Sequence, residues 1–337
     1  TFKTANGNWD TQGHSDRIVN IDDRALAAIH ALIEDQSTPV EESRFLQPYS
    51  TKTLDVFRAL TSASSLADAI SPIVRIVSTP EGEHTIEVPG WQMSRIWDET
   101  NAQRGLGVIR RETRFHGKPN ELVISGPIVY VGNPIYKTPK DNCRTKADYE
   151  VVDLGQADDD YLPRTNFSPV GEDLAEYRRH LPRCRWDPTL NHTDFFRFGF
   201  RKRINLNSER SFIGSIIPKG VAHIDSFGSL AFKSVDDLLT ASALFVSLAY
   251  DFQFKSAARN DVVDSVLASL PFTDPGHTAK HRSLRLACLT AAYTELWDVN
   301  ANKLNPLPWH SNDPRLSRDG PVEGPAAWDR TAALRTE

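Results

Sequence analysis

The sequence predicts an α+β protein in which helical portions flank a mixed, β-rich region. Leucine and isoleucine recur at helical spacing in the first 80 residues and again after residue 233. From His84 onward, β-branched residues alternate with polar ones, and Gly, Pro and Asn separate the short runs. At 337 residues with 39% hydrophobic content, the chain is long enough for more than one packed unit.

A helical scaffold portion is predicted over residues 1–82. Asp22 is the expected N-cap of its first helix, because a short acidic side chain directly precedes an apolar stripe that includes Ile29 and Ile33. We expect the helical period to continue to about residue 80.

The β-rich region is predicted over residues 83–233. Its expected strands carry the sequences HTIEV, GVIRRETRF, ELVIS, PIVYVG, DFFRFGFRKRI and RSFIGSIIP. Residues 137–194 show little periodicity, and an irregular stretch of that length inside a compact protein is usually functional or mobile.

A helical support and a C-terminal tail are predicted over residues 234–337. Ser234 and Asp237 form a capping-box start for a helix from Asp236 to about Phe254, and residues 277–297 predict one more long helix. The last ten residues, WDRTAALRTE, are charged and compatible with a helix, and the first residue is not Met. We therefore expect the chain to be a piece of a longer protein.

Composition narrows the functional classes. The 39 Lys and Arg against 44 Asp and Glu give a net charge of −5, which argues against non-specific binding of polyanions by the whole molecule. The three cysteines form no Cys-x-x-Cys pair, so neither a disulfide framework nor a zinc site is predicted, and a reducing cytoplasm fits. No apolar run approaches the roughly 18 residues of a membrane span, so no membrane partner is expected.

The stretch VGNPIY, residues 131–136, differs by one residue from the Asn-Pro-Pro-Tyr box with which amino-group DNA methyltransferases hold a flipped adenine. Ile135 replaces the second proline, and no acidic strand followed by a Gly-rich turn lies upstream to hold S-adenosylmethionine. The pattern favours a turn at Asn133. We expect no catalytic residue and no cofactor site in this chain, and His277 with His281 lacks a third metal ligand.

The most basic stretch is residues 178–203, with eight lysines and arginines against two aspartates. In FRFGFRKR, strand alternation would place the phenylalanines in a core and Arg197, Arg201 and Arg203 on the opposite, solvated face. Such a row could neutralise phosphates and read guanine. The alternative is an ordinary solvated face paired with the acidic residues 150–160.

Two further groups extend this prediction. The residues after the basic strand, NLNSER, carry the donors and acceptors that base edges require, although a tight turn uses the same residue types for local reasons. A second basic cluster lies on the earlier strand GVIRRETRF. The residues predicted to contact DNA are Arg110, Arg111, Arg114, Arg197, Arg201, Lys202, Arg203, Asn207, Glu209, Arg210 and Lys219.

These stretches together resemble a known family. In order along the chain, SGPIVYVGNPIYKTP, NSER with IIP, YDF, SLPF and LRLACLTAAYTELWD are similar to the C-terminal half of large type IIG-like adenine-specific DNA methylases. Such proteins occur in restriction-modification, BREX and DISARM-type phage-defence systems. The resemblance covers roughly residues 85–330 and implies that Asn133 belongs to the family's Gly-Asn-Pro turn.

The resemblance implies a target recognition domain with a helical support, whose cofactor and catalytic motifs lie in an absent part. The expected function is sequence-specific recognition of double-stranded DNA for an N6-adenine methyltransferase. S-adenosylmethionine is expected for the parent protein only, and the expected partners are a methyltransferase domain in cis or in trans and other defence-system subunits. The alternative is an interaction scaffold whose basic face docks an acidic protein.

Overall fold

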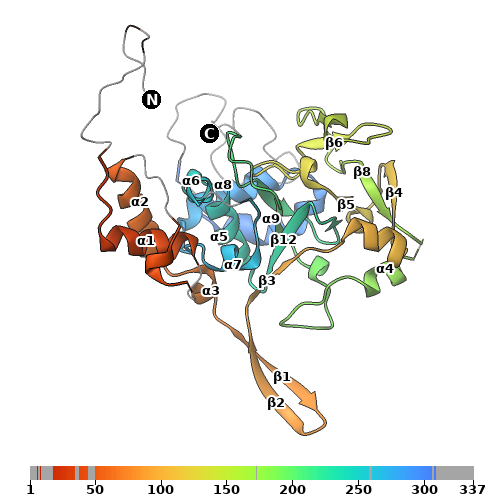
Figure 1. Ribbon diagram of the computed structural model, residues 1–337. Helices are drawn as coiled ribbons and strands as arrows, with labels where there is room; N and C mark the ends of the chain where they lie inside the picture. The colour runs from red at the N-terminus through yellow and green to blue at the C-terminus, as the bar shows by residue number, and fades with distance from the viewer. Residues whose placement is uncertain are drawn as a thin grey trace.

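The computed structural model describes residues 6, 8, 18–34, 38–44, 50–171, 173–257, 260–305 and 307–308. It has the predicted α+β architecture, with helices near both ends and several small sheets between them (Figure 1). The sequence WDRTAALRTE, expected to be compatible with a helix, lies outside the described residues.

The N-terminal helices are α1 (Asp23–Ile33), α2 (Thr51–Thr61) and α3 (Leu66–Ala69). The Oδ1 atom of Asp22 accepts a hydrogen bond from the N–H of Ala25 at 2.7 Å, which confirms the predicted N-cap. Ile29 and Ile33 are buried against Phe57 of α2, so the predicted stripe forms a small core between the two helices.

The predicted helical portion ends earlier than expected. Residues 73–79 form strand β1 (Ile73–Thr79), which pairs with β2 (Gly82–Val88) in an antiparallel two-stranded ribbon. The prediction of helix up to residue 82 is therefore wrong. The β-branched residues of IVRIVST favour an extended chain, and the Pro80-Glu81-Gly82 turn, with φ +129° at Gly82, reverses it.

Two four-stranded sheets form the centre of the β-rich region. The first has the order β10-β9-β12-β3, with all neighbours antiparallel, and the second has the order β11-β5-β8-β4. The strands are β3 (Trp91–Ser94), β4 (Ile109–Arg114), β5 (Val123–Ile124), β8 (Thr165–Pro169), β9 (Arg197–Arg201), β10 (Gly214–Ile217), β11 (Ala222–His223) and β12 (Phe227–Phe232). Gly199 lets β9 pass close under Phe227, because an added Cβ would lie 2.6 Å from that ring.

Short elements fill the stretch that showed little periodicity. It contains a small sheet of β6 (Lys137–Pro139) and β7 (Tyr149–Val151), strand β8, and helix α4 (Ala175–Arg179). The remaining single turns are Val40–Glu42, Asn101–Gly105, Pro119–Glu121, Gly126–Ile128, Lys146–Asp148, His192–Asp194, Ala291–Tyr293 and Ala301–Lys303.

The C-terminal helices are α5 (Val235–Phe245), α6 (Leu248–Ser256), α7 (Asp264–Ala268), α8 (Gly276–Ala287) and α9 (Thr294–Asn300). Ser234 Oγ accepts from the N–H of Asp237, as predicted, but the expected helix from 236 to 254 breaks at Ser247, which caps α6. The helix expected over 277–297 ends at Ala287. The N–H of Ala291 donates to Asp159 O at 2.6 Å, which replaces the bond that a continuous helix would make.

The largest hydrophobic core joins the first sheet to the C-terminal helices. Phe198 and Phe200 of β9 pack with Phe212 and with Phe245 of α5, and the rings of Phe212 and Phe254 are 4.2 Å apart. The change from strand to helix falls between Phe232 and Val235. One cluster of side chains spans both sides of it.

Candidate nucleic-acid interface

Strand β9 has the predicted alternation, but its arginine face is covered rather than solvated. Arg197 has no exposed surface. Its guanidinium donates to the main-chain oxygens of Phe195 and Val221, and to Ser229 Oγ at 3.1 Å. The prediction that Arg197 faces solvent is therefore wrong, and its predicted DNA contact conflicts with this burial, because the segment around Val221 covers this face and Ser229 of the neighbouring strand β12 shares it.

A buried polar cluster surrounds Arg197. The Nε2 atoms of His192 and His223 lie 3.1 and 2.8 Å from Ser229 Oγ, and all four side chains are fully buried. Burial lowers the pKa of Arg197 to about 9, so the guanidinium stays charged at neutral pH. Burial and the nearby guanidinium lower the pKa of His223 to about 3, so that ring stays neutral.

The hydrogen bonds of this cluster assign the histidine tautomers. His223 Nδ1 lies 3.3 Å from Ile224 O and must donate to it, so His223 Nε2 accepts the Ser229 hydroxyl proton. Ser229 Oγ then accepts from Arg197 and from His192 Nε2. This leaves His192 Nδ1 as a buried acceptor without a hydrogen-bond partner. The cluster is a structural junction between β9, β11 and β12.

Arg201 and Lys202, both predicted to contact DNA, instead bind groups of the same chain. Arg201 donates to Gly126 O and Val129 O at distances of 2.7–3.1 Å, and burial lowers its pKa. Lys202 donates to Asp225 at 2.5 Å and its side chain is 18% exposed. The expected solvated face at Arg201 thus contacts the segment of residues 126–129, and Lys202, directly after β9, pairs with Asp225.

Arg203 is the one predicted cation of this strand that the structure leaves largely in solvent. Its side chain is 73% exposed, and its guanidinium lies 3.2 Å from Asp261. An exposed ion pair of this kind contributes little to stability, so the guanidinium can exchange its partner at small cost.

The segment after Arg203 forms a tight loop, residues 204–211, held by its own polar groups. The main-chain N–H of Asn207 donates to Asn205 Oδ1 at 3.1 Å, and Ser208 Oγ lies 2.7 Å from Asn205 O. At one end of the loop, the N–H of Ile204 donates to Asn260 O at 2.9 Å. The predicted turn is therefore present, and Asn205 organises it.

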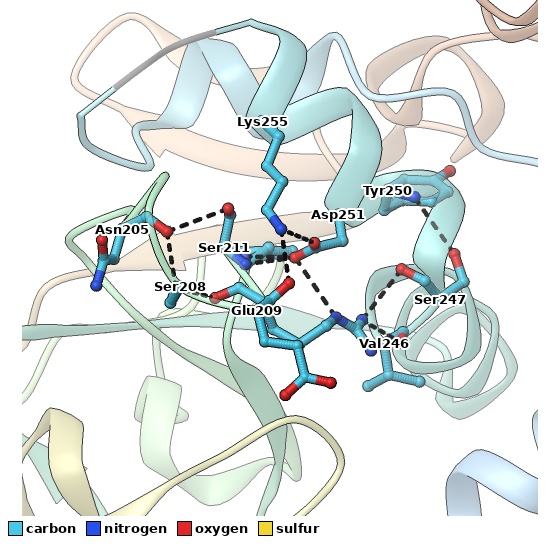
Figure 2. A network of polar contacts seen from close by, with 11 residues as sticks. Asn205, Ser208, Glu209, Ser211, Val246, Ser247, Tyr250, Asp251 and Lys255 are labelled. Atoms are coloured by element: carbon cyan, nitrogen blue, oxygen red, sulfur yellow. Dashed lines mark hydrogen bonds and ion pairs between the residues drawn. The ribbon is translucent and has the colours of Figure 1, made fainter. Parts of the chain in front are cut away.

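Asp251 of α6 anchors the other end of this loop (Figure 2). Its Oδ1 accepts the N–H groups of Ser211 and Phe212 at 2.5 and 3.0 Å, and the carboxylate is almost fully buried. Lys255, one turn further along α6, lies 3.5 Å from Asp251 Oδ2 and donates to Glu209 O at 2.6 Å. These bonds between α6 and the loop fix the loop on the helix.

Arg210 is part of this anchor. Its guanidinium donates to Val246 O and Ser247 O at 2.6 and 3.2 Å, where α5 ends and α6 begins, and lies 3.5 Å from Asp251. Val246 O belongs to the C-terminal end of α5, where carbonyls lack helical partners and a cation binds favourably, whereas Ser247 O also accepts from the N–H of Asp251. The prediction that Arg210 contacts DNA conflicts with this position, since its side chain is 16% exposed and its guanidinium donates to the two carbonyls.

The side chains at the tip of the loop are exposed, unlike those of the anchor. Asn207 and Glu209 are exposed, and Figure 2 shows the Glu209 carboxylate pointing away from the anchoring contacts, which use its main-chain oxygen. Both predicted base-reading side chains are therefore on the surface of a fixed loop. Lys219 is half exposed, donates to Glu295 at 2.5 Å, and lies over the Phe196 ring.

The second basic cluster lies on β4, at the edge of the other sheet. Arg110, Arg111 and Arg114 are exposed; Arg110 pairs with Glu112 at 2.9 Å, and Arg111 donates to Arg144 O. Figure 1 places β4 at one side of the molecule, away from β12 and the sheet that holds β9. The structure thus does not gather the two predicted clusters into one row.

The remaining observations concern the turn at Asn133, metal ligands and the length of the helices. Asn133 is buried in a turn, where its Oδ1 accepts from the N–H of Ile135 at 3.1 Å, as the turn prediction required. Across the described ranges, no group of three His, Cys, Asp or Glu side chains could hold a metal ion. Every helix in those ranges is too short or too polar to cross a membrane.

Sequence reasoning missed Asp251 and Lys255. The available signal was a single carboxylate within the apolar run LFVSLAYDFQF, where a buried charge requires partners. Comparison with known proteins adds no assignment: no family model matches the chain, and no curated protein is significantly similar to it.

Proposed function

We propose that this chain is a target recognition unit that binds double-stranded DNA in a sequence-specific manner for an S-adenosylmethionine-dependent N6-adenine methyltransferase. The observation that carries the proposal is the loop of residues 204–211. Its ends are anchored on α6 and its tip presents Asn207 and Glu209 to solvent.

A fixed loop with an amide and a carboxylate at its tip suits direct readout. An asparagine amide can bond the N6 and N7 edge of adenine, and a glutamate can accept from the N4 amino group of cytosine. Because the anchor holds the loop before binding, little conformational entropy is lost when the tip meets a base. Arg203, next to the loop and exposed, is the nearest candidate for a guanine or phosphate contact.

Phosphate contacts are assigned to the arginines of β4. They lie on an edge strand with their side chains in solvent, and Arg110 and Arg114 share one acidic neighbour, Glu112 of the same strand. Such contacts position a protein on the duplex and carry no sequence information. Arg197, Arg201, Lys202 and Arg210 are left out of the proposed interface, because their bonds within the chain hold the fold.

The proposed setting follows the resemblance. The methyltransferase domain that uses S-adenosylmethionine acts in cis or in trans, in a restriction-modification or phage-defence system, and other defence subunits are further proposed partners. Cys143, Cys184 and Cys288 are free and buried, which fits the proposed reducing cytoplasm.

Selection from a randomised duplex library, followed by fluorescence anisotropy on the selected duplex and its single-base variants, tests the proposal. Replacing both Asn207 and Glu209 by Ala should relax discrimination at the base positions they read, by about 1–3 kcal/mol for each bidentate hydrogen-bonded pair that is removed. Arg111→Ala should weaken binding to all duplexes and reduce the salt slope by about 0.9.

Lys52→Ala is the matched control, since Lys52 is an exposed cation on α2. It should change neither discrimination nor salt slope. If selection enriches no sequence, or if the double variant discriminates as well as the parent chain, the recognition proposal fails. Binding of an acidic protein in preference to every duplex would support the scaffold alternative instead.

A further inference from the structure

The ribbon of β1 and β2 stands apart from the rest of the fold. Seven consecutive residue pairs, from Ile73 with Val88 to Thr79 with Gly82, join the two strands. Figure 1 shows the ribbon projecting away from the body. Among the described strands, each of the two pairs only with the other. A two-stranded ribbon is marginally stable by itself in water, so this one lacks a neighbour that would stabilise it.

The exposed surface of the ribbon is apolar along β1. Val74 and Ile76 are 61% and 68% exposed and point to the same face, because they are two residues apart on one strand. Only the base of the ribbon is packed, where Ile73 and Val88 contact the cluster that contains Trp186. Two large β-branched side chains in solvent on a projecting strand are a feature of interaction surfaces.

The two free edges of the ribbon differ in charge. Strand β1 carries one charged residue, Arg75, and its guanidinium donates to Arg185 O near the base. Strand β2 carries Glu83 and Glu87, and Glu81 lies in the turn. Charged side chains protect an edge strand against pairing, so the edge of β1 is the open one. The acidic ribbon is also unsuited to a nucleic-acid backbone.

We propose that β1 pairs antiparallel with β1 of a second copy of this chain, across a twofold axis at Ile76. In this register Ile76 faces Ile76 of the second copy, Val74 faces Ser78, and Arg75 faces Val77. All seven residues of β1 find a partner on the matching face, and no like charges meet.

The same operation on β2 gives the opposite result. Full overlap of two copies of residues 82–88 places Glu83 directly opposite Glu87, and it does so twice. Like charges directly opposite each other destabilise a strand pair. The charge pattern therefore selects the β1 edge, and full overlap of its seven residues selects this register.

The proposed contact makes a four-stranded sheet of order β2-β1-β1-β2. It has more than the three strands below which sheets are marginal, and its most exposed apolar residues, Val74 and Ile76, lie on the two central strands. A twofold contact is closed, and the glutamates of β2 protect both outer edges, so the assembly stops at two copies. This interface is independent of the proposed DNA contact, which uses other elements.

Cross-linking tests the register. Facing residues in antiparallel strands have Cα atoms about 4.5–5.5 Å apart, within the range that a disulfide spans. Ile76→Cys should therefore give a disulfide-linked dimer under mild oxidation. The three native cysteines are buried, which keeps the background low. Thr85→Cys is the matched control, because Thr85 lies directly across the ribbon from Ile76 on the protected strand.

Sedimentation equilibrium tests the association without a cross-link. The unmodified chain should show a monomer–dimer equilibrium that depends on concentration, Ile76→Lys should be monomeric, and Thr85→Lys should dimerise as the parent does. Circular dichroism spectra check that the variants fold, as expected for exposed positions. A parent chain that stays monomeric at every concentration, or equal cross-linking of the two cysteine variants, overturns the proposal.

Discussion

Removal of the Asp251 carboxylate should detach the loop of residues 204–211 from α6. In Asp251→Ala the N–H groups of Ser211 and Phe212 lose their acceptor while both residues stay buried. A buried donor without a partner costs about 1–3 kcal/mol, so we expect the free energy of unfolding to fall by about 2–6 kcal/mol. This is a large part of the stability of an ordinary domain.

Two companion substitutions divide this loss into its parts. Asp251→Asn keeps an oxygen at the position of Oδ1 and therefore both hydrogen bonds, but without charge. A bond to a charged group exceeds a neutral one by about 1 kcal/mol, so we expect a loss of about 2 kcal/mol. Lys255→Met removes a partly exposed ion pair at 3.5 Å and an exposed hydrogen bond to Glu209 O, and should cost about 1 kcal/mol or less.

Urea denaturation of the three variants, followed by circular dichroism, measures these differences. The expected order of stability is parent, Lys255→Met, Asp251→Asn, Asp251→Ala, with unchanged m values. If Asp251→Ala is no less stable than Lys255→Met, Asp251 contributes no more than a surface ion pair and the anchoring argument is refuted.

Three further outcomes are expected. Arg197→Ala should lower the free energy of unfolding by about 3 kcal/mol or more, since it removes a buried guanidinium whose three nitrogens each donate a hydrogen bond. Replacement of the exposed Arg203 by Ala should change it by about 0.5 kcal/mol or less, and urea denaturation measures both. Burial and the neighbouring arginines lower the pKa of His281 to about 4, below its usual 6.5. As the pH falls, the unfolded chain therefore binds this proton before the folded chain does, and the free energy of unfolding decreases from pH 6.5 toward pH 4. In denaturation curves taken across this pH range, His281→Phe should lose less stability than the parent, because one proton fewer binds on unfolding. An unchanged pH dependence would contradict the assignment. Asn133→Ala should cost about 1 kcal/mol through the lost bond to the N–H of Ile135, visible as a lower melting temperature with DNA affinity unchanged; a loss of affinity at unchanged melting temperature would point to a functional role.

Local features of this fold were predictable because their causes are local. The caps at Asp22 and Ser234 depend on a side chain and a main-chain N–H three residues apart, and both are present. Strand β1 of the ribbon was missed because it follows a helical segment and carries apolar residues that fit either period, whereas HTIEV of β2 was predicted as a strand. The helix break before Ala291 depends on a hydrogen bond to Asp159, which no local pattern contains.

For the candidate site too, local sequence patterns predict local structure but not the contacts with distant parts of the chain. Alternation along FRFGFRKR correctly separates the phenylalanines from the arginines, because a strand has a period of two. It cannot tell whether the arginine side meets water or protein. The carbonyls that bind Arg201 come from residues 126 and 129, about seventy positions earlier, and only the folded chain brings them together.

In the anchored loop, the groups that hold it on α6 are different from the side chains that it exposes at its tip. Besides the Arg210 side chain, main-chain atoms of residues 209, 211 and 212 hold the loop on the helix, and these atoms are the same whatever side chains the tip carries. Residues 207 and 209 can therefore be exchanged for others without refolding the loop. Selection for a new binding partner can therefore act through substitutions at these two positions alone, while α6 and its anchoring bonds to the loop stay the same.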